Sequence, residues 1–366
     1  MRVPRHGQYP QRPYRPALIA LALLCLLGQS AAQSAVLGLV TDTAEQRVTV
    51  FDADSDLVSQ QMAATPGNAN GDCAVSGAGS LGIASNSSSQ LSFIDLSAAG
   101  AAPAPLEISN LGVDMALSPD GNFLVIAGGG ALQQPLSVVD LRQQTEISTS
   151  RHFVDHSSVE FCDDATLLIT TLRGRQYHGT RDNALYSAGL GFEGEIELDG
   201  ARLQVGAQPN NSACAPGSRS GVVLDRDGGI TSFTLPGLQA AERQHTLGGM
   251  GLSAAFDTAG RRLYVRTEAG VEAFDFDPDT GAMQRAWSQP APTPTTYYGI
   301  EQLVVHPSGD KLYVDGGREL LVLSSADGAT LSTIAAGDAT GVCLAVVERG
   351  LEYIAGGAEV AGVAAP

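Results

Sequence analysis

Residues 115–127 read MALSPDGNFLVIA, and residues 136–141 read LSVVDL. The same phrase returns as LVVHPSGDKLYV (303–314), followed by LLVLS (320–324). In each copy an apolar strand runs into a turn that contains Gly, a second strand follows, and a third strand ends near Asp. Copies recur at a period of about 40–50 residues, which is typical of a β-propeller built from small sheets.

The copies form two series, each with seven members. One series is the turn-centred pair of first and second strands, and the other is the third strand. Together they predict an all-β fold, a seven-bladed β-propeller of four-stranded antiparallel blades.

The two series are out of phase, because a third strand (48–52) comes first and a strand pair (342–355) comes last. The offset predicts a ring closed by strands from both termini, which removes the exposed sheet edges. Two segments, 35–41 and 351–355, are alternatives for the second strand of the shared blade. We expect one propeller domain over 34–357 and a short flexible Ala/Gly tail at 358–366.

The N-terminus has the pattern of a signal peptide, predicted over residues 1–32. Basic residues precede an apolar run at 17–27, and Ser30-Ala31-Ala32 fits the small-residue cleavage rule. The apolar run is too short to span a bilayer, so stable membrane insertion is not expected. A periplasmic or secreted location follows. The basic residues of the leader are Arg2, Arg5, Arg12 and Arg15.

The formal net charge of the chain is −18, and removal of the leader makes it more negative. A surface of this sign repels nucleic acid and anionic lipid. We therefore expect no nucleic-acid partner.

The leaderless chain contains four cysteines, an even number that permits two disulfides in an exported protein. Alignment of the repeats places Cys73 and Cys343 in the first and last units, which a closed ring makes neighbours. It places Cys162 and Cys214 in consecutive units. The alignment favours Cys73–Cys343 and Cys162–Cys214, with four buried thiols as the alternative. No Cys or His spacing indicates a metal site.

Four segments carry a family resemblance. SLGIASNSSSQLSFIDL (80–96) and VGAQPNNSACAPGS (205–218) resemble the repeat named for its Tyr-Val-Thr-Asn strand, the YVTN repeat. HPSGDKLYV (306–314) and FDFDPDTGAM (274–283) are similar to lactonase-type seven-bladed propellers. The resemblance implies a propeller, but these are strand and turn motifs that specify little about activity.

One loop face of the predicted blade with strands near 159–171 and 184–188 gathers basic and aromatic residues. Arg presents a planar fork suited to carboxylate or phosphate, so a small anionic ligand is expected there. The alternative is a solvated loop whose arginines pair with nearby acids such as Asp182 or Glu160. The loop at 286–299 should lie on the same face. The candidate ligand-binding residues are Arg151, His152, His156, Arg173, Arg175, Tyr177, His178, Arg181, Tyr297 and Tyr298.

Two functions fit these features. The first is an exported scaffold that binds an unidentified protein or a small anionic ligand through its loops. The second is a lactonase-like hydrolase acting at the channel mouth, which needs a residue to activate water and another to stabilise the oxyanion. The candidate catalytic residues for it are His156, Glu160, Arg173 and Glu301.

No cofactor is predicted. Calcium is the alternative to a turn where aspartates alternate, at 52–56 and 275–279, because this spacing can wrap the ion. Neither cluster continues to the distant Glu of an EF-hand loop, and Asp is also a favoured turn former. A turn is therefore the preferred interpretation of both clusters.

Overall fold

The structure is a computed structural model that describes residues 33–42, 45–63, 71–76, 81–85, 88–96, 102–128, 136–150, 154–162, 165–173, 183–206, 208–294, 300–337 and 339–349. The chain divides into two units. One unit, Ala35–Val347, holds the propeller. The other comprises Met1–Ser34 and Glu348–Pro366, and the structure describes only four of its residues, at the outer ends of two strands. The predicted signal peptide and tail lie outside the described residues.

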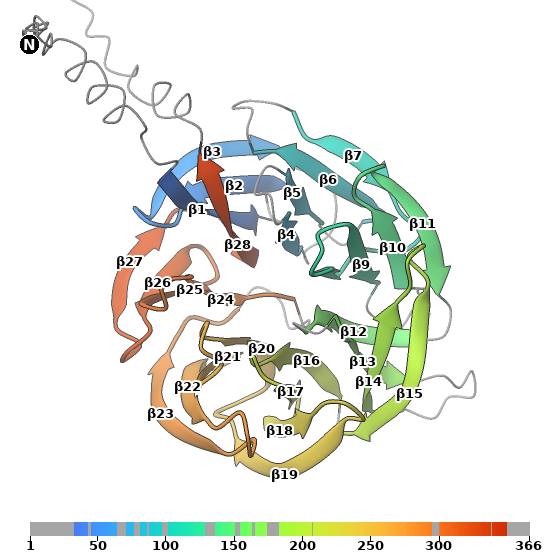
Figure 1. The fold of residues 1–366 in the computed structure, drawn as a ribbon. Helices are drawn as coiled ribbons and strands as arrows, with labels where there is room; N and C mark the ends of the chain where they lie inside the picture. The colour runs from blue at the N-terminus through green and yellow to red at the C-terminus, as the bar shows by residue number, and fades with distance from the viewer. Residues whose placement is uncertain are drawn as a thin grey trace, which may run out of the picture. The chain divides into compact units, whose positions relative to one another are not determined.

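The unit Ala35–Val347 consists of seven four-stranded sheets arranged in a ring, as the sequence predicts (Figure 1). We number the blades in chain order from the shared blade, giving strands from the axis outward. Blade 1 is β28 (Ala339–Arg349), β1 (Gln33–Asp42), β2 (Arg47–Asp52) and β3 (Leu57–Ala63). Blade 2 is β4 (Cys73–Val75), β5 (Leu81–Ala84), β6 (Gln90–Asp95) and β7 (Ala104–Glu107). Blade 3 is β8 (Asp114–Leu117), β9 (Phe123–Ala127), β10 (Leu136–Asp140) and β11 (Thr145–Ser150).

The other four blades repeat this order. Blade 4 is β12 (Val154–Phe161), β13 (Leu167–Arg173), β14 (Ala184–Leu190) and β15 (Ile196–Gln204). Blade 5 is β16 (Pro209–Cys214), β17 (Ser220–Asp225), β18 (Gly229–Thr234) and β19 (Gln239–Thr246). Blade 6 is β20 (Gly251–Phe256), β21 (Arg262–Thr267), β22 (Gly270–Phe276) and β23 (Met283–Pro290). Blade 7 is β24 (Leu303–Val305), β25 (Lys311–Asp315), β26 (Leu320–Ser324) and β27 (Thr330–Ile334).

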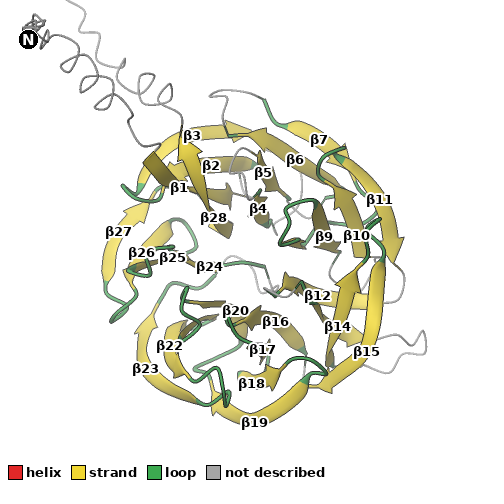
Figure 2. Cartoon of the chain, in the orientation of Figure 1, coloured by secondary structure: helices red, strands yellow, loops and turns green. Residues whose placement is uncertain are grey.

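The described part of the chain is strand, turn and loop, without a helix (Figure 2). None of these residues forms a helix long and apolar enough to cross a membrane. Middle strands are buried along their whole length, as in β9, whereas outer strands such as β3 are mostly exposed. A middle strand has a blade on each side, so it reads as a continuous apolar run and not as an alternating one.

Packing between blades divides the core into seven clusters, one between each pair of neighbours. The cluster between blades 7 and 1 closes the ring. There Phe51 of β2 and Tyr313 of β25, both fully buried, have ring centroids 5.1 Å apart. Tyr313 also donates a hydrogen bond from its hydroxyl to Asp56 at 2.6 Å. Residues far apart in the sequence thus meet in one continuous core.

Closure uses one strand from the C-terminal region and three from the N-terminal region. β28 is the innermost strand of blade 1 and lies beside β1, which pairs with β2 over Leu37–Asp42. The second strand of the shared blade is therefore the 35–41 segment. The other candidate, 351–355, lies outside the described residues.

We predict that Phe51→Ala destabilises the protein by about 3–5 kcal/mol, because it opens a cavity in the closing core. Phe192→Ala is the matched control, since Phe192 is 94% exposed and its loss should change stability by less than about 0.5 kcal/mol. Urea unfolding followed by circular dichroism measures both. Equal effects of the two substitutions would contradict the closing role of Phe51.

Candidate functional site

The innermost strands of the seven blades surround the axis of the ring (Figure 1). Each of them pairs with a strand of its own blade on one side only. The other edge carries backbone N–H groups that need acceptors once they are buried.

Side chains from the preceding blade supply several of these acceptors. Asp72 Oδ2 accepts the N–H of Met115 at 2.8 Å, and Asp114 Oδ2 accepts the N–H of Val159 at 2.7 Å. In blade 5, Asn211 Oδ1 accepts an N–H from β20 at 3.0 Å. The three side chains occupy equivalent places at the start of an inner strand. A blade is therefore joined to the next one by a side-chain acceptor near the axis.

Four acids influence one another near the axis, and we call Asp72, Asp114, Glu160 and Glu301 the carboxyl belt. Burial raises the pKa of Asp72 to about 7, although backbone N–H groups of Cys73, Met115 and Glu301 oppose that rise. Burial also raises the pKa of Asp114 well above its usual value, and the charge of Asp72 raises it further.

Glu301 behaves in the same way. Burial raises its pKa well above its usual value, and the charges of Asp72 and Glu160 add to the effect. Neighbouring carboxylates cannot all ionise cheaply in a desolvated site. Asp72, Asp114 and Glu301 therefore hold their protons to higher pH than ordinary carboxyl groups do.

Asp72 and Asp114 form the innermost pair of the belt. The Asp72 side chain is fully buried, and its Oδ1 atom has no hydrogen-bond partner among the described residues. The side chains of Asp72 and Asp114 are hydrogen-bonded to each other. A protonated carboxyl donates where a carboxylate can only accept, so a hydrogen bond between the two side chains requires a proton on one of them. The pair therefore favours sharing one proton.

A cavity of about 420 Å³ lies on the axis, and we call it the cup. Its lining comes from the inner strands of all seven blades, from the turns that follow two of them and from the segment that precedes β24. The belt residues Glu160 and Glu301 line it, while most other lining residues are apolar. The apolar lining includes Val75, Met115, Leu117, Phe161, Phe256, Val304, Val305 and Leu344.

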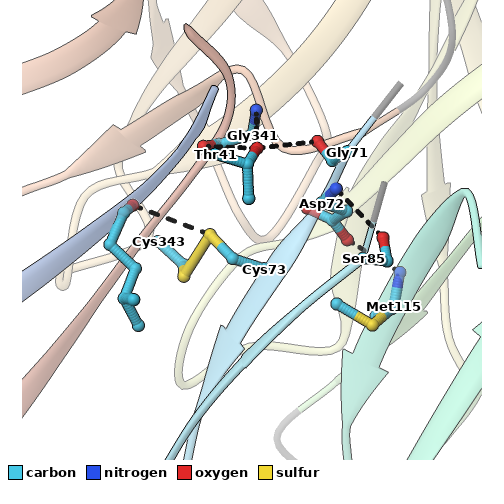
Figure 3. The surroundings of a disulfide bond; sticks show 9 residues. Thr41, Gly71, Asp72, Cys73, Ser85, Met115, Gly341 and Cys343 are labelled. Carbon is cyan, nitrogen blue, oxygen red and sulfur yellow. Dashed lines mark hydrogen bonds between the residues drawn. A yellow bond between two sulfur atoms is a disulfide. The ribbon is translucent and has the colours of Figure 1, made fainter. Parts of the chain in front are cut away.

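Two disulfides connect inner strands of adjacent blades beside the cup. Cys73 is bonded to Cys343 and Cys162 to Cys214, the pairs that the repeat alignment favours. Their Cα atoms lie 5.9 Å and 5.4 Å apart. The Cys73–Cys343 bond lies next to Asp72, a residue of the carboxyl belt (Figure 3). Disulfides persist in oxidising compartments, which indicates that the protein resides in one.

The structure brings together two of the candidate catalytic residues, Glu160 and Glu301, which both line the cup. His156 and Arg173 lie on β12 and β13, in the part of each strand next to the predicted ligand loop. Their side chains are outside the described part of the structure. The remaining predicted ligand residues lie wholly outside it, namely Arg151, His152, Arg175, Tyr177, His178, Arg181, Tyr297 and Tyr298.

The two aspartate clusters are turns whose carboxylates have separate protein partners. Asp52 accepts the N–H of Ser55 at 2.9 Å, whereas Asp56 accepts a bond from Lys311 at 2.7 Å. Asp277 accepts the N–H of Asp279 at 3.0 Å. Within the described ranges, no three His, Cys, Asp or Glu residues form a group that could hold a metal ion.

Sequence reasoning did not single out Asp72 and Asp114. A usable signal exists, because GDCAV (71–75) and VDMAL (113–117) place Asp at the same position of consecutive repeats. Two residues after that position the repeats carry a small or apolar side chain, except in blade 4. There the residue is Glu160. The others are Ala74, Ala116, Ala213, Ala255, Val304 and Cys343.

Comparisons with known proteins show the fold. No family model matches the chain, and no curated protein matches it either. A functionally unknown protein from Desulfotomaculum acetoxidans superposes with a TM-score of 0.74 at 18% identity, over 86% of this chain and 99% of that one. A "putative 6-phosphogluconolactonase" from Bacteroides uniformis gives a TM-score of 0.68 at 13% identity, over 86% and 100%. Hydrazine synthase from Kuenenia stuttgartiensis superposes with a TM-score of 0.61 at 15% identity, over 78% of this chain and 95% of that one.

We predict that Asp114→Asn removes a pH-dependent loss of stability. The raised pKa values mean that the folded belt binds more protons than the unfolded chain, so wild-type stability falls as pH rises from about 4 to 7. The Asn side chain can donate to Asp72 and still accept from Val159. Relative to wild type, the free energy of unfolding of the variant should increase by more than about 1.4 kcal/mol as pH rises over this range, the equivalent of one pKa unit.

Asp120→Asn is the control, because its effect on stability should depend on pH in the opposite direction. A hydrogen bond from Ser118 lowers the pKa of Asp120, so its contribution is present above about pH 4 and disappears as pH falls. This variant should be less stable than wild type at pH 7 and equal to it in strong acid. Urea unfolding across the pH range measures both variants. A stability difference between Asp114→Asn and wild type that is constant with pH would overturn the belt description.

Proposed function

We propose that this chain is an exported binding protein whose ligand enters the cup on the propeller axis. The observation that supports this is a cavity of about 420 Å³ shared by all seven blades. Its size lies within the range of small-molecule sites, which combine apolar walls with a few polar groups. The disulfides beside the cup fix neighbouring inner strands, so a ligand meets a preformed site and binding requires little reordering.

The anion site expected at the Arg-rich loops is a separate proposal. Those loops join second to third strands or lead into first strands, whereas the cup is lined partly by turns that join first to second strands. Pro216 and Pro307 belong to such turns. In an antiparallel blade these two kinds of connection lie at opposite ends of the strands. The two proposals therefore concern different residues and can be tested independently.

Blocking the cup tests the binding function. Leu117→Trp on β8 and Val305→Trp on β24 each enlarge a half-buried side chain that lines the cavity. We expect a small molecule that raises the melting temperature of wild type to lose at least tenfold in affinity for both variants. A ligand bound elsewhere would keep its affinity for both, which would refute the cup as the binding site. Phe192→Ala, outside the cup, serves as the control.

Lactone hydrolysis is a second candidate function, favoured by the convergence of Glu160 and Glu301 in one cavity. A glutamic acid whose pKa is raised can serve as a general acid near neutral pH, and an ionised neighbour can activate water. Structures with the same fold include two proteins each described as a "putative 6-phosphogluconolactonase", at an identity that shows the fold alone.

The hydrolase predicts that the full chain opens a lactone and that Glu301→Gln lowers kcat by at least about 100-fold, the usual scale of acid–base catalysis. Titration of the acid released from a lactone panel measures this. Glu197→Gln, on the exposed strand β15, should leave the rate unchanged. A wild-type rate no higher than that of Glu301→Gln would exclude the hydrolase.

A further inference from the structure

A second cavity, of about 360 Å³, lies between blades 3 and 4, and we call it the rim groove. Its lining extends from Phe161, at the end of β12, to Phe192, in the turn that follows β14. Adjacent strands of a sheet lie about 4.8 Å apart, so the groove runs for about 10 Å from the first strand of blade 4 to its third. Its floor is apolar, because Phe123, Phe161 and Leu190 belong to the core between the two blades or pack against it.

Phe192 borders the outer end of the rim groove and is almost fully exposed. A well-defined turn holds it there, in which the N–H of Gly194 donates to the carbonyl of Gly191 at 3.0 Å. Gly194 has φ +86° and packs so closely against blade 3 that a Cβ atom there would overlap Ile147. The turn is thus fixed to the neighbouring blade, and its aromatic side chain is presented in one place.

Single exposed apolar side chains are normal on protein surfaces. Phe192 differs because it borders a preformed apolar groove and lies on a fixed turn, so that little ordering is needed when a partner binds. Aromatic side chains beside well-packed pockets are typical anchors of protein interfaces. The rim groove therefore has the properties of a docking surface.

The charges around the rim groove indicate the kind of partner. Asp120 lines the groove, and a hydrogen bond from Ser118 lowers its pKa, so its carboxylate is ionised at neutral pH. Glu193 is exposed in the turn at the outer end. The basic residue among the described lining residues is Arg142, and Asp140 lies 3.5 Å from its guanidinium. The groove is therefore apolar on its floor and acidic at its edge.

This distribution of charge disfavours two other occupants. A second copy of the chain would bring an acidic edge against an acidic edge. An anionic lipid surface would be repelled by a protein of net charge −18. A segment of another protein that carries basic residues beside an apolar one complements both the floor and the edge of the groove.

We propose that the rim groove binds an extended, basic segment of a partner protein. One apolar side chain of the segment lies on the groove floor against Phe192, and flanking Lys or Arg side chains face Asp120 and Glu193. An extended chain advances about 3.3 Å per residue, so about three residues fit along the groove. The inference does not depend on the cup, with which the groove shares Phe161 among the described lining residues.

The experiment is titration of four fluorescein-labelled decapeptides with the full chain, followed by fluorescence anisotropy. The peptides are (Leu-Lys)5, (Leu-Glu)5, (Leu-Ser)5 and (Ser-Lys)5, in which alternation places the two side chains on opposite sides of an extended chain. We expect (Leu-Lys)5 to bind at least tenfold more tightly than each of the others. Equal binding of (Ser-Lys)5 would show attraction to the acidic surface as a whole and would overturn the site. Tightest binding of (Leu-Glu)5, or no binding of any peptide, would overturn it as well.

Variants locate the binding. Phe192→Ala should lower the affinity for (Leu-Lys)5 at least tenfold, as the loss of an aromatic anchor does. Glu193→Lys should lower the same affinity and leave that for (Leu-Ser)5 unchanged. The matched controls are Leu57→Ala on β3 and Glu107→Lys on β7, exposed residues of other blades whose substitution should have no effect.

Phe192→Trp keeps an aromatic anchor, so it should retain the affinity for (Leu-Lys)5. Its fluorescence should shift to shorter wavelength when the peptide covers the ring. Full affinity in Phe192→Ala would overturn the proposal. Light scattering that shows wild type as a dimer and Phe192→Ala as a monomer would overturn it too, because the occupant would then be a second copy of the chain.

Discussion

The ring depends on how the innermost strands satisfy the edges that face the axis. A strand with a free edge inside a protein must find acceptors for its N–H groups, or the blade is destabilised. Asp72, Asp114 and Asn211 meet this need by reaching from one blade to the backbone of the next. Structural acids are thereby brought to the place where a propeller has its central cavity.

Closure makes the blades interdependent. β28 comes from the far end of the chain and becomes the innermost strand of a blade otherwise built from residues 33–63. Its Cys343 is bonded to Cys73 of blade 2 (Figure 3). The last strand is therefore joined to β1 by backbone pairing and to blade 2 by a disulfide. On the other side, Phe51 and Tyr313 fill the core between blades 1 and 7. Every blade contributes to the wall of the cup, so the cup is complete only in the closed ring.

The sequence predicts the fold well because each blade is a local unit with its own turn and strand signals. The SPDG turn at 118–121 and the HPSG turn at 306–309 mark strand pairs whatever the rest of the chain does. The candidate site is harder to predict, because its residues lie in different blades and meet only when the ring closes. Glu160 and Glu301 could be proposed as candidates, but their proximity to Asp72 and Asp114 could not. The choice of β1 over 351–355 likewise depends on tertiary pairing.

Two acids of the carboxyl belt serve the fold, and the other two do not follow the repeat. Asp72 and Asp114 follow the repeat and have backbone N–H partners, so the fold alone accounts for them. Glu160 breaks the repeat, and Glu301 precedes the position that the repeat uses for edge acceptors. Both add negative charge to a site that already holds a buried pair, which raises the free energy of the folded protein. The repeat fold does not account for that cost, which singles out the cup wall as the candidate functional surface.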